Sequence, residues 1–237
     1  MVKLVLIFDW DSWMPRRRSS LIKKADPGWH DILCLRPKRL LDDPAAGRMV
    51  FAERLAWAQE LEVEIGVGSG DFLLAAARNK PDTLFVGLEY AAKFLKLSRD
   101  RVAQENLKNV VLMAGDASLF LKFVFPEESV DVFHIYFPDP WPKRAHHKKR
   151  AMGERGLVLI NRCLKKRGAI YFATDHKGYA QDARRTLDQF DHLGLEQEAT
   201  ITRPGHTYFA PYGAPTHFGS KYAVEGRPIY AKQVRKR

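Results

Sequence analysis

A carboxylate and a tryptophan stand between prolines in the segment Phe137–Lys143, directly before a run of basic residues. The carboxylate is Asp139, and the basic run extends from Lys143 to Arg150. The apolar residues 130–137 predict a buried strand that the prolines must end. Because open α/β sheets bind ligands at the carboxyl ends of their strands, we expect Asp139 in an active site, beside cations that suit phosphate groups.

A glycine-rich turn follows a strand predicted over residues 61–65. Gly66, Gly68 and Gly70 are spaced Gly-x-Gly-x-Gly, and a helix is predicted to begin near Asp71. A dinucleotide site would need the spacing Gly-x-Gly-x-x-Gly, and the negative charge of Asp71 would repel a pyrophosphate at the helix N-terminus. The turn therefore favours a ligand group other than a phosphate.

Acidic residues stand at or just after the carboxyl ends of four successive predicted strands, at Glu64, Glu89, Asp116 and Asp139. Glu64 suits a cationic ligand, and S-adenosylmethionine carries both a sulfonium and an ammonium group. Glu89 is placed to accept hydrogen bonds from ribose hydroxyls, and Asp116 from an adenine amino group. Helix capping by Asp116 and solvation of Glu64 at a strand edge are the alternatives, but the repetition of acids favours a cofactor site.

A parallel sheet would bring these residues to one edge. The predicted strands are 61–65, 84–88, 110–114, 130–137, 168–174 and 229–234, and the predicted helices are 72–79, 91–106, 117–124, 154–165 and 176–190. This alternation predicts an α/β fold with a mostly parallel central sheet and helices on both faces. Asp175 would follow the fifth strand on the same rim as Asp139. We expect one catalytic domain over residues 60–237, preceded by an N-terminal arm over 1–59.

The motifs resemble those of bacterial tRNA (guanine-N7-)-methyltransferases, over about residues 60 to 235. The motifs that carry the resemblance are Glu64–Gly70, Gly87–Glu89, Gly115–Ala117, Phe137–Lys143 with His146–Arg150, and Ala173–Asp175. The Pro-Asp-Pro-Trp-Pro-Lys segment is the specific one, whereas many methyltransferases share the glycine turn.

The resemblance implies a Rossmann-like class I methyltransferase that uses S-adenosylmethionine on tRNA, usually at guanosine 46 of the variable loop. It implies that the cofactor is bound by Glu64, Gly66, Gly68, Gly70, Glu89, Asp116 and Asp139. Asp139 would also be the catalytic residue. Lys143, Asp175 and the segment from Thr216 would contact the tRNA.

The implied reaction asks little of a base, because N7 of guanine carries a lone pair and no proton. Asp139 is therefore expected to stabilise the positive charge that develops on the purine and to orient it. His146 and His147 could act as bases, but phosphate contact or solvation is the favoured interpretation for both. The enzyme would have to expose a nucleotide whose N7 faces the major-groove edge.

The chain departs from the family at Gly219, where the usual Thr-Lys-Phe-Glu motif has its acid; here the motif is Thr216-His217-Phe218-Gly219. Two other classes of protein remain as alternatives. A methyltransferase of exocyclic amines would normally show an Asn/Asp-Pro-Pro-aromatic motif, whose paired prolines are missing. A non-catalytic RNA-binding protein on the same fold would be expected to have lost the glycine turn or the acids.

The composition agrees with an RNA partner. The formal charge of the 237 residues is +11, which favours a polyanion or an acidic surface. Cys34 and Cys163 are far apart and lack metal spacing, which argues against a disulfide scaffold or a metal site and fits a reducing cytoplasm. The apolar run near the N-terminus is too short to span a membrane. The sequence leaves the oligomeric state open.

Overall fold

The computed structural model describes residues 32–33, 58–202, 211–214 and 216–237, in which eight strands form one sheet. The strands are β1 Ile32–Leu33, β2 Glu60–Ile65, β3 Thr83–Glu89, β4 Val110–Ala114, β5 Val130–Tyr136, β6 Leu164–Thr174, β7 Leu195–Thr202 and β8 Tyr230–Lys236. Their order is β1-β4-β3-β2-β5-β6-β8-β7. From β1 to β6 all neighbours are parallel, whereas β8 is antiparallel to both β6 and β7.

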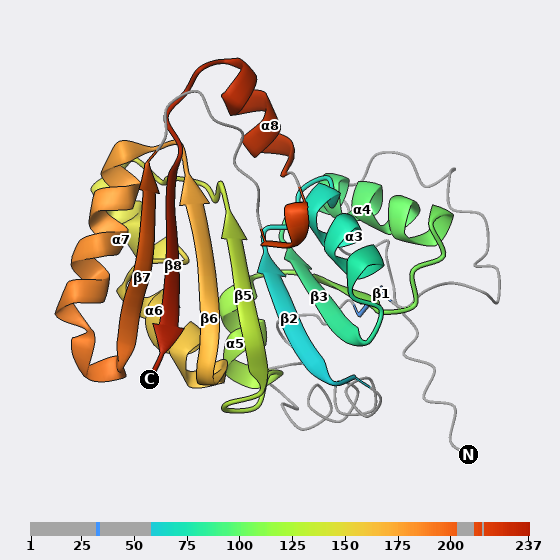
Figure 1. Ribbon diagram of the computed structural model, residues 1–237, viewed down its shortest axis with the longest axis horizontal. Coiled ribbons are helices and arrows are strands. Elements are labelled where there is room, and N and C mark those ends of the chain that lie inside the picture. The colour runs from blue at the N-terminus through green and yellow to red at the C-terminus, as the bar shows by residue number, and fades with distance from the viewer. Residues whose placement is uncertain (1–31, 34–57, 203–210, 215) are drawn as a thin grey trace.

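Helices cover both faces of this sheet (Figure 1). They are α3 Asp71–Asn79, α4 Ala92–Gln104, α5 Ala117–Phe123, α6 Glu154–Cys163, α7 Lys177–Gln189 and α8 His217–Val224, with 3-10 turns η2 Arg144–Lys149, η3 Asp191–Leu193 and η4 Pro211–Gly213. Apolar residues of α5, α6 and α7 share one core with one face of the strands. Those of α3 and α4 form a second core with the other face. The α/β fold with a mostly parallel sheet is confirmed.

Alternation along the central strands explains the two cores. Leu61 and Val63 of β2 are buried on the side of α5 and α6, while Glu62 between them is also fully buried. Strands buried on both faces read as continuous apolar runs, and that is why residues 84–88 and 110–114 were recognisable as strands from the sequence. At Glu62, polar contacts with Lys80, His134 and Tyr212 replace apolar packing.

Strands β2 and β5 are parallel neighbours at the middle of the sheet, with β3 and β4 on one side and β6 on the other. The chain therefore leaves β2 in one direction and resumes in the opposite direction at β5. A crevice opens at such a switch point because the two connecting helices lie on opposite faces. The carboxyl ends of β2 and β5 carry the glycine turn and the Asp139 loop, so the topology joins the two predicted motifs.

The C-terminal elements differ most from the sequence prediction. Strand β7 was not predicted, because its sequence Leu195–Thr202 is largely polar, and no helix was predicted for the stretch after Thr216 that forms α8. The helix predicted over 154–165 ends at Cys163, since Leu164 already pairs with Val130 and begins β6. In Figure 1, α8 lies beyond the carboxyl ends of β5 and β6 and extends toward α3.

The division into an arm over residues 1–59 and a domain over 60–237 stays a prediction, because most of the arm lies outside the described residues. Of the arm, Ile32 and Leu33 pair in parallel with Leu112 and Met113. Within the described ranges, no helix has both the length and the apolarity that crossing a bilayer requires. Cys163 is buried as a free thiol, and Cys34 is outside the described residues.

Candidate active site

The three glycines of the turn share a left-handed backbone conformation but differ in what surrounds them. Gly66, Gly68 and Gly70 have φ angles of 86°, 56° and 82°, which side chains with a Cβ rarely adopt. A Cβ on Gly70 would lie 2.7 Å from the Leu74 side chain, so this glycine allows α3 to begin close to the turn. A Cβ on Gly66 or Gly68 would meet no atom within 4 Å. The backbone there faces open space, as a turn that admits a ligand must.

Helix α4 braces this turn from outside. The Ser98 hydroxyl donates to the Gly68 carbonyl oxygen at 2.7 Å, and Arg101 donates to both the Ser69 carbonyl and the Asp71 carboxylate at 2.7 Å. Burial favours the neutral form of Asp71, but the Ser69 hydroxyl and Arg101 hold its pKa below the ordinary value. The charge of Asp71 is thus compensated by Arg101, and its repulsion of a phosphate is weaker than the sequence suggested.

Glu64 is the acidic residue best placed for a cationic ligand. Its side chain is 4% exposed, and its Oε2 atom is buried without a hydrogen-bond partner. Burial, together with the neighbouring charges of Glu89 and Asp71, raises the pKa of Glu64 well above the ordinary value. A buried carboxylate oxygen without a partner is costly. A sulfonium or ammonium group would stabilise the ionised form, so this residue fits S-adenosylmethionine.

Glu89 and Asp116 already accept bonds from backbone amides. Glu89 accepts from Gly68 N at 2.9 Å and from Ala91 N at 2.7 Å, which ties the end of β3 to the glycine turn. Asp116 accepts through Oδ1 from the amide and hydroxyl of Ser118, at 2.9 and 2.7 Å. Asp116 therefore caps α5, as the alternative interpretation held. Contacts of these two carboxylates with ribose and adenine stay predictions.

The Asp139 loop leaves β5 with an exposed carboxylate. Phe137 and Trp141 on either side have φ angles of 50° and 42°, in the left-handed region. The amide of Phe137 donates to the Ala173 carbonyl oxygen at 2.7 Å, which fastens the start of the loop to β6. Two left-handed residues within five positions turn the chain sharply, so that Asp139 stands at the rim instead of continuing the strand.

The basic segment divides into exposed and buried cations. Lys143 precedes η2 and is exposed, as is Lys148. The Lys149 amine lies 4.5 Å from the centre of the Trp141 ring, which keeps it beside the loop. Arg150 is 4% exposed and binds Pro140, Trp141 and Asp182 within the protein. Arg150 was expected among the cations that suit phosphate, but its guanidinium is buried and bound to groups of the protein itself.

Helix α8 brings the C-terminal motif to the same rim. The Thr216 hydroxyl accepts from Gly219 N at 2.9 Å and so caps the helix. Phe218 and Tyr222 pack against Phe137, with ring centres 6.4 and 5.5 Å away. Because Phe137 directly follows β5, these contacts fasten α8 over the Asp139 loop.

Asp175 follows β6 on this rim and pairs with Arg227 at 3.2 Å. The Arg227 guanidinium also binds Glu225 at 2.7 Å and lies 4.6 Å from the centre of the Tyr222 ring. Every residue predicted for the site thus lies at the carboxyl ends of the parallel strands or on α8 beside them. Arg227 was not predicted, since only the tertiary structure places it beside Asp175.

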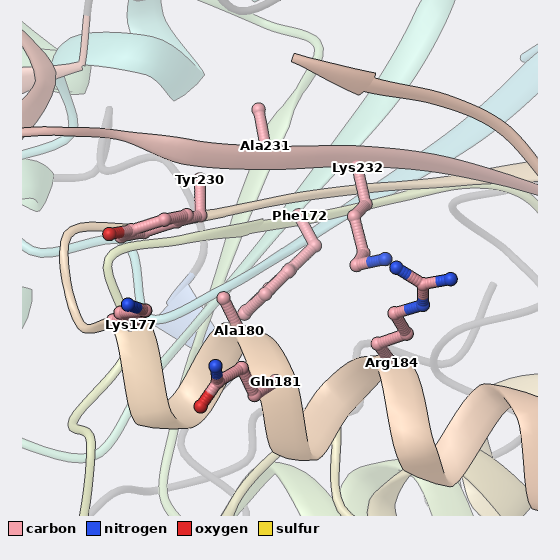
Figure 2. A pocket seen from close by; sticks show the side chains of 8 residues that line it. All are labelled: Phe172, Lys177, Ala180, Gln181, Arg184, Tyr230, Ala231 and Lys232. Atoms are coloured by element: carbon pink, nitrogen blue, oxygen red, sulfur yellow. The ribbon is translucent and has the colours of Figure 1, made fainter. Parts of the chain in front are cut away.

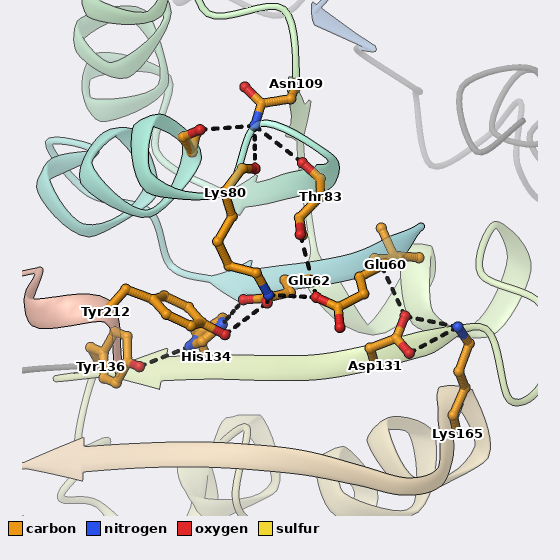
Figure 3. A network of polar contacts seen from close by, with 12 residues as sticks. Glu60, Glu62, Lys80, Thr83, Asn109, Asp131, His134, Tyr136, Lys165 and Tyr212 are labelled. Carbon is orange, nitrogen blue, oxygen red and sulfur yellow. Dashed lines mark hydrogen bonds and ion pairs between the residues drawn. The ribbon is translucent and has the colours of Figure 1, made fainter. Parts of the chain in front are cut away.

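A buried polar network lies below the rim and was not predicted from the sequence (Figure 3). Glu62 binds His134 Nε2 at 2.7 Å, Lys80 Nζ at 2.7 Å and the Tyr212 hydroxyl at 2.8 Å. Burial lowers the pKa of His134, so its neutral ring donates from Nε2 to Glu62 and accepts at Nδ1 from the Tyr136 hydroxyl at 2.8 Å. The network anchors η4, and with it the start of the C-terminal segment, to β2 and β5.

A separate cavity of about 160 Å³ lies between α7 and β8, away from the glycine turn. It is lined by Phe172, Lys177, Ala180, Gln181, Arg184, Tyr230, Ala231 and Lys232. Figure 2 shows the Arg184 and Lys232 side chains converging at one end of the cavity. None of the residues predicted for the site lines it. In the described part of the chain no cluster of three His, Cys, Asp or Glu residues could hold a metal ion.

Comparison with known proteins places the chain among methyltransferases. The profile of the family described as "Putative methyltransferase" matches residues 58–232. A tRNA (guanine-N(7)-)-methyltransferase of Limosilactobacillus reuteri (strain DSM 20016) is 27% identical over 208 residues, which cover 88% of this chain and 94% of the relative. The tRNA (guanine-N(7)-)-methyltransferase of Nitrosococcus oceani is 36% identical over 168 residues, covering 71% of this chain and 68% of the relative.

Solved structures agree at the level of the fold. Precorrin-6y C5,15-methyltransferase from Geobacter metallireducens superposes with a TM-score of 0.54 at 20% identity, over 80% of this chain and 86% of that one. An antibiotic-related methyltransferase superposes with a TM-score of 0.59 at 17% identity, over 79% and 92% of the two chains. With the glycine turn and the buried Glu64 suited to the methyl donor, the chain belongs to the tRNA (guanine-N7-)-methyltransferase family and is a methyltransferase that uses S-adenosylmethionine.

Proposed function

We propose that this chain methylates N7 of a guanosine in tRNA, with guanosine 46 of the variable loop as the target. The observation that carries the proposal is the position of Asp139. This exposed carboxylate follows the end of β5, beside strand β2, which carries Glu64. The exposed cations Lys143 and Lys148 follow it in the chain. A nucleic acid held by these cations would present a base between Asp139 and the cofactor side of the rim.

The residues present suit a nucleophile that has no proton to lose. When bound, S-adenosylmethionine supplies a methyl group to the N7 lone pair, and the electrons of the broken carbon–sulfur bond stay on sulfur. The purine thereby becomes positively charged. The Asp139 carboxylate stabilises that charge and orients the ring, and no step requires His146 or His147 to remove a proton. His146 packs edge-on against Trp141, with ring centres 5.6 Å apart, which supports a structural role.

Recognition of guanine needs acceptors, because its N1–H and exocyclic amino group are donors. Asp175 and Thr216 are the residues we assign to the substrate on the far side of Asp139, with Lys143 on the phosphate backbone. Arg227 pairs with the Asp175 carboxylate at 3.2 Å and so orients it at the rim. Gly219 supplies no carboxylate where the family usually has one, so in this chain Asp175 would contribute a larger share of the selectivity for guanine over other bases.

Mass spectrometry of nucleosides tests the proposal. Unmodified tRNA incubated with the enzyme and S-adenosylmethionine should yield 7-methylguanosine, and a transcript with adenosine at position 46 should yield none. A product methylated at an exocyclic amine would show that the chain is a methyltransferase of exocyclic amines. Tight tRNA binding without any methylated product would instead favour a non-catalytic RNA-binding protein.

A further inference from the structure

Arg150 ends the basic segment but lies inside the protein, where it joins α7 to the Asp139 loop. Its Nε donates to the Pro140 carbonyl oxygen at 2.7 Å, and its Nη2 donates to the Trp141 carbonyl oxygen at 3.3 Å. Its Nη1 pairs with the Asp182 carboxylate of α7. The guanidinium carbon lies 4.7 Å from the centre of the Tyr179 ring. A single side chain thus holds the two residues that directly follow Asp139.

The backbone directly after Asp139 has few hydrogen-bond donors of its own. Pro140 and Pro142 have no N–H groups, so they cannot donate backbone hydrogen bonds across the turn. Trp141 between them has a φ angle of 42°, which residues with a Cβ adopt only when their surroundings impose it. The carbonyl oxygens of Pro140 and Trp141 accept from one planar guanidinium, whose rigid geometry defines their relative orientation.

We propose that Arg150 is a positioning residue for methyl transfer, which aligns Asp139 by holding the backbone that follows it. The inference rests on the proposed function, because it takes Asp139 as the carboxylate that stabilises the methylated purine. Displacement of a reacting group by about 1 Å can cost about a hundredfold in rate. Arg150 touches neither the purine nor the methyl donor in this scheme, and its effect passes through the loop.

Asp182, the partner of Arg150 on α7, allows the proposal to be tested without unfolding the protein. Asp182 also pairs with Arg185, and it lies 3.7 Å from His147 Nδ1. Removal of Arg150 therefore leaves this carboxylate with a cationic partner. Arg185 is a matched control, because it shares the same carboxylate but has a side chain that is 72% exposed and turned to solvent.

The experiment compares Arg150→Gln, Arg150→Lys and Arg185→Gln with the parental enzyme. Single-turnover methylation at saturating tRNA should fall about a hundredfold in Arg150→Gln. Arg150→Lys should retain an intermediate rate, because an ammonium can still pair with Asp182 but cannot engage both carbonyls. Arg185→Gln should keep the parental rate. Affinities for S-adenosylmethionine and tRNA should stay at parental values in all three variants.

Hydrogen exchange of the amides in residues 139–149 supplies a readout that does not need activity. These amides should exchange faster in Arg150→Gln, while those of β2 and α3 keep their protection. If Arg150→Gln does not fold, the rate and exchange of Arg150→Lys decide the question.

Two outcomes overturn this inference alone. The first is a parental methylation rate in a variant whose loop amides exchange faster. The second is a loss of tRNA affinity with an unchanged rate at saturation, which would make Arg150 a phosphate contact. A parental enzyme that forms no 7-methylguanosine would instead refute the proposed function, and this inference with it.

Discussion

Buried carboxylates line the side of the rim that we propose for the cofactor, whereas exposed cations and a solvent-facing carboxylate line the side that we propose for the substrate. On the first side, Glu64 and Glu89 are 4% and 8% exposed, and α4 braces the glycine turn with Ser98 and Arg101. On the second side, Asp139 is exposed, and its loop is held by the side chain of Arg150.

The difference between the two sides suits the two ligands that we propose for them. A small cation bound among buried acids gains strong electrostatic stabilisation because water is excluded. A long polyanion must be gripped in water, where many exposed cations each contribute little and salt screens them. Substitutions on the cofactor side should therefore act on cofactor affinity and pH dependence, and substitutions on the substrate side on rate, salt dependence or tRNA affinity.

Asp139→Asn should have the largest effect, because it keeps the shape of the side chain and removes the charge that we propose stabilises the product cation. We expect single-turnover methyl transfer to fall by about a hundredfold or more, while tRNA affinity changes little. Rapid-quench assays with labelled methyl donor measure this. A parental rate in the Asn variant would refute the proposal that the charge of Asp139 stabilises the methylated purine.

Glu64→Gln should come next, with a tenfold or greater loss of affinity for S-adenosylmethionine, the scale of a lost hydrogen bond to a charged group. The rate at saturating cofactor should change much less than in the Asp139 variant. Calorimetric titration measures the affinity. Unchanged affinity would show that Glu64 Oε2 does not contact a cationic group of the cofactor. It would thereby refute the proposed role of the buried carboxylates.

The same residue predicts a pH dependence. Burial raises the pKa of Glu64 above its value in the unfolded chain, so the folded protein without cofactor retains a proton that the unfolded chain loses. This contribution to stability is present below the ordinary pKa and is lost as pH rises toward the folded pKa.

Because a bound cation favours the ionised form, cofactor binding should release a proton, and affinity should rise with pH in that window. Proton release is measured by calorimetry in buffers of different ionisation enthalpy. Glu64→Gln should abolish it, without lowering the stability of the protein above neutral pH. Proton release that persists in the Gln variant would assign the titration to another group.

Lys148→Gln combined with Lys149→Gln should have a smaller effect, confined to the substrate side. We expect tRNA affinity to fall and the slope of log affinity against log salt to decrease by about 1 to 2, one unit for each lost phosphate contact. Lys166→Gln with Arg167→Gln is the matched control, because these exposed cations lie toward the opposite end of β6. Equal losses in the two double variants would indicate general attraction by net charge.

Thr216→Ala should have the smallest effect. Loss of the cap on Gly219 N should destabilise α8 by about 1 kcal/mol, and the tRNA KM should rise a few-fold while cofactor affinity stays constant. Hydrogen exchange of the α8 amides gives the local stability. A change in cofactor affinity would show that α8 reaches across both sides of the rim, as the 3.7 Å approach of His217 to Asp71 would allow.

The sequence by itself determined the alternation of strands and helices, the mostly parallel sheet and the rim residues, because these follow from local patterns. Apolar runs predict buried strands, prolines end them, and the order of a parallel sheet carries the residue after each strand to one edge. Glu64, Asp116 and Asp139 were found in this way, at the ends predicted for them.

Only the tertiary structure decided which charges stay available. Arg150 and Lys148 look alike in the basic segment, yet one is buried against Asp182 and the other is exposed, because α7 packs against the loop from 32 residues away. The partners of His134 and Asp175 are likewise distant in the chain. A local pattern carries no information on such contacts, since the free energy of a charged group depends on what surrounds it in space and not on its neighbours in sequence.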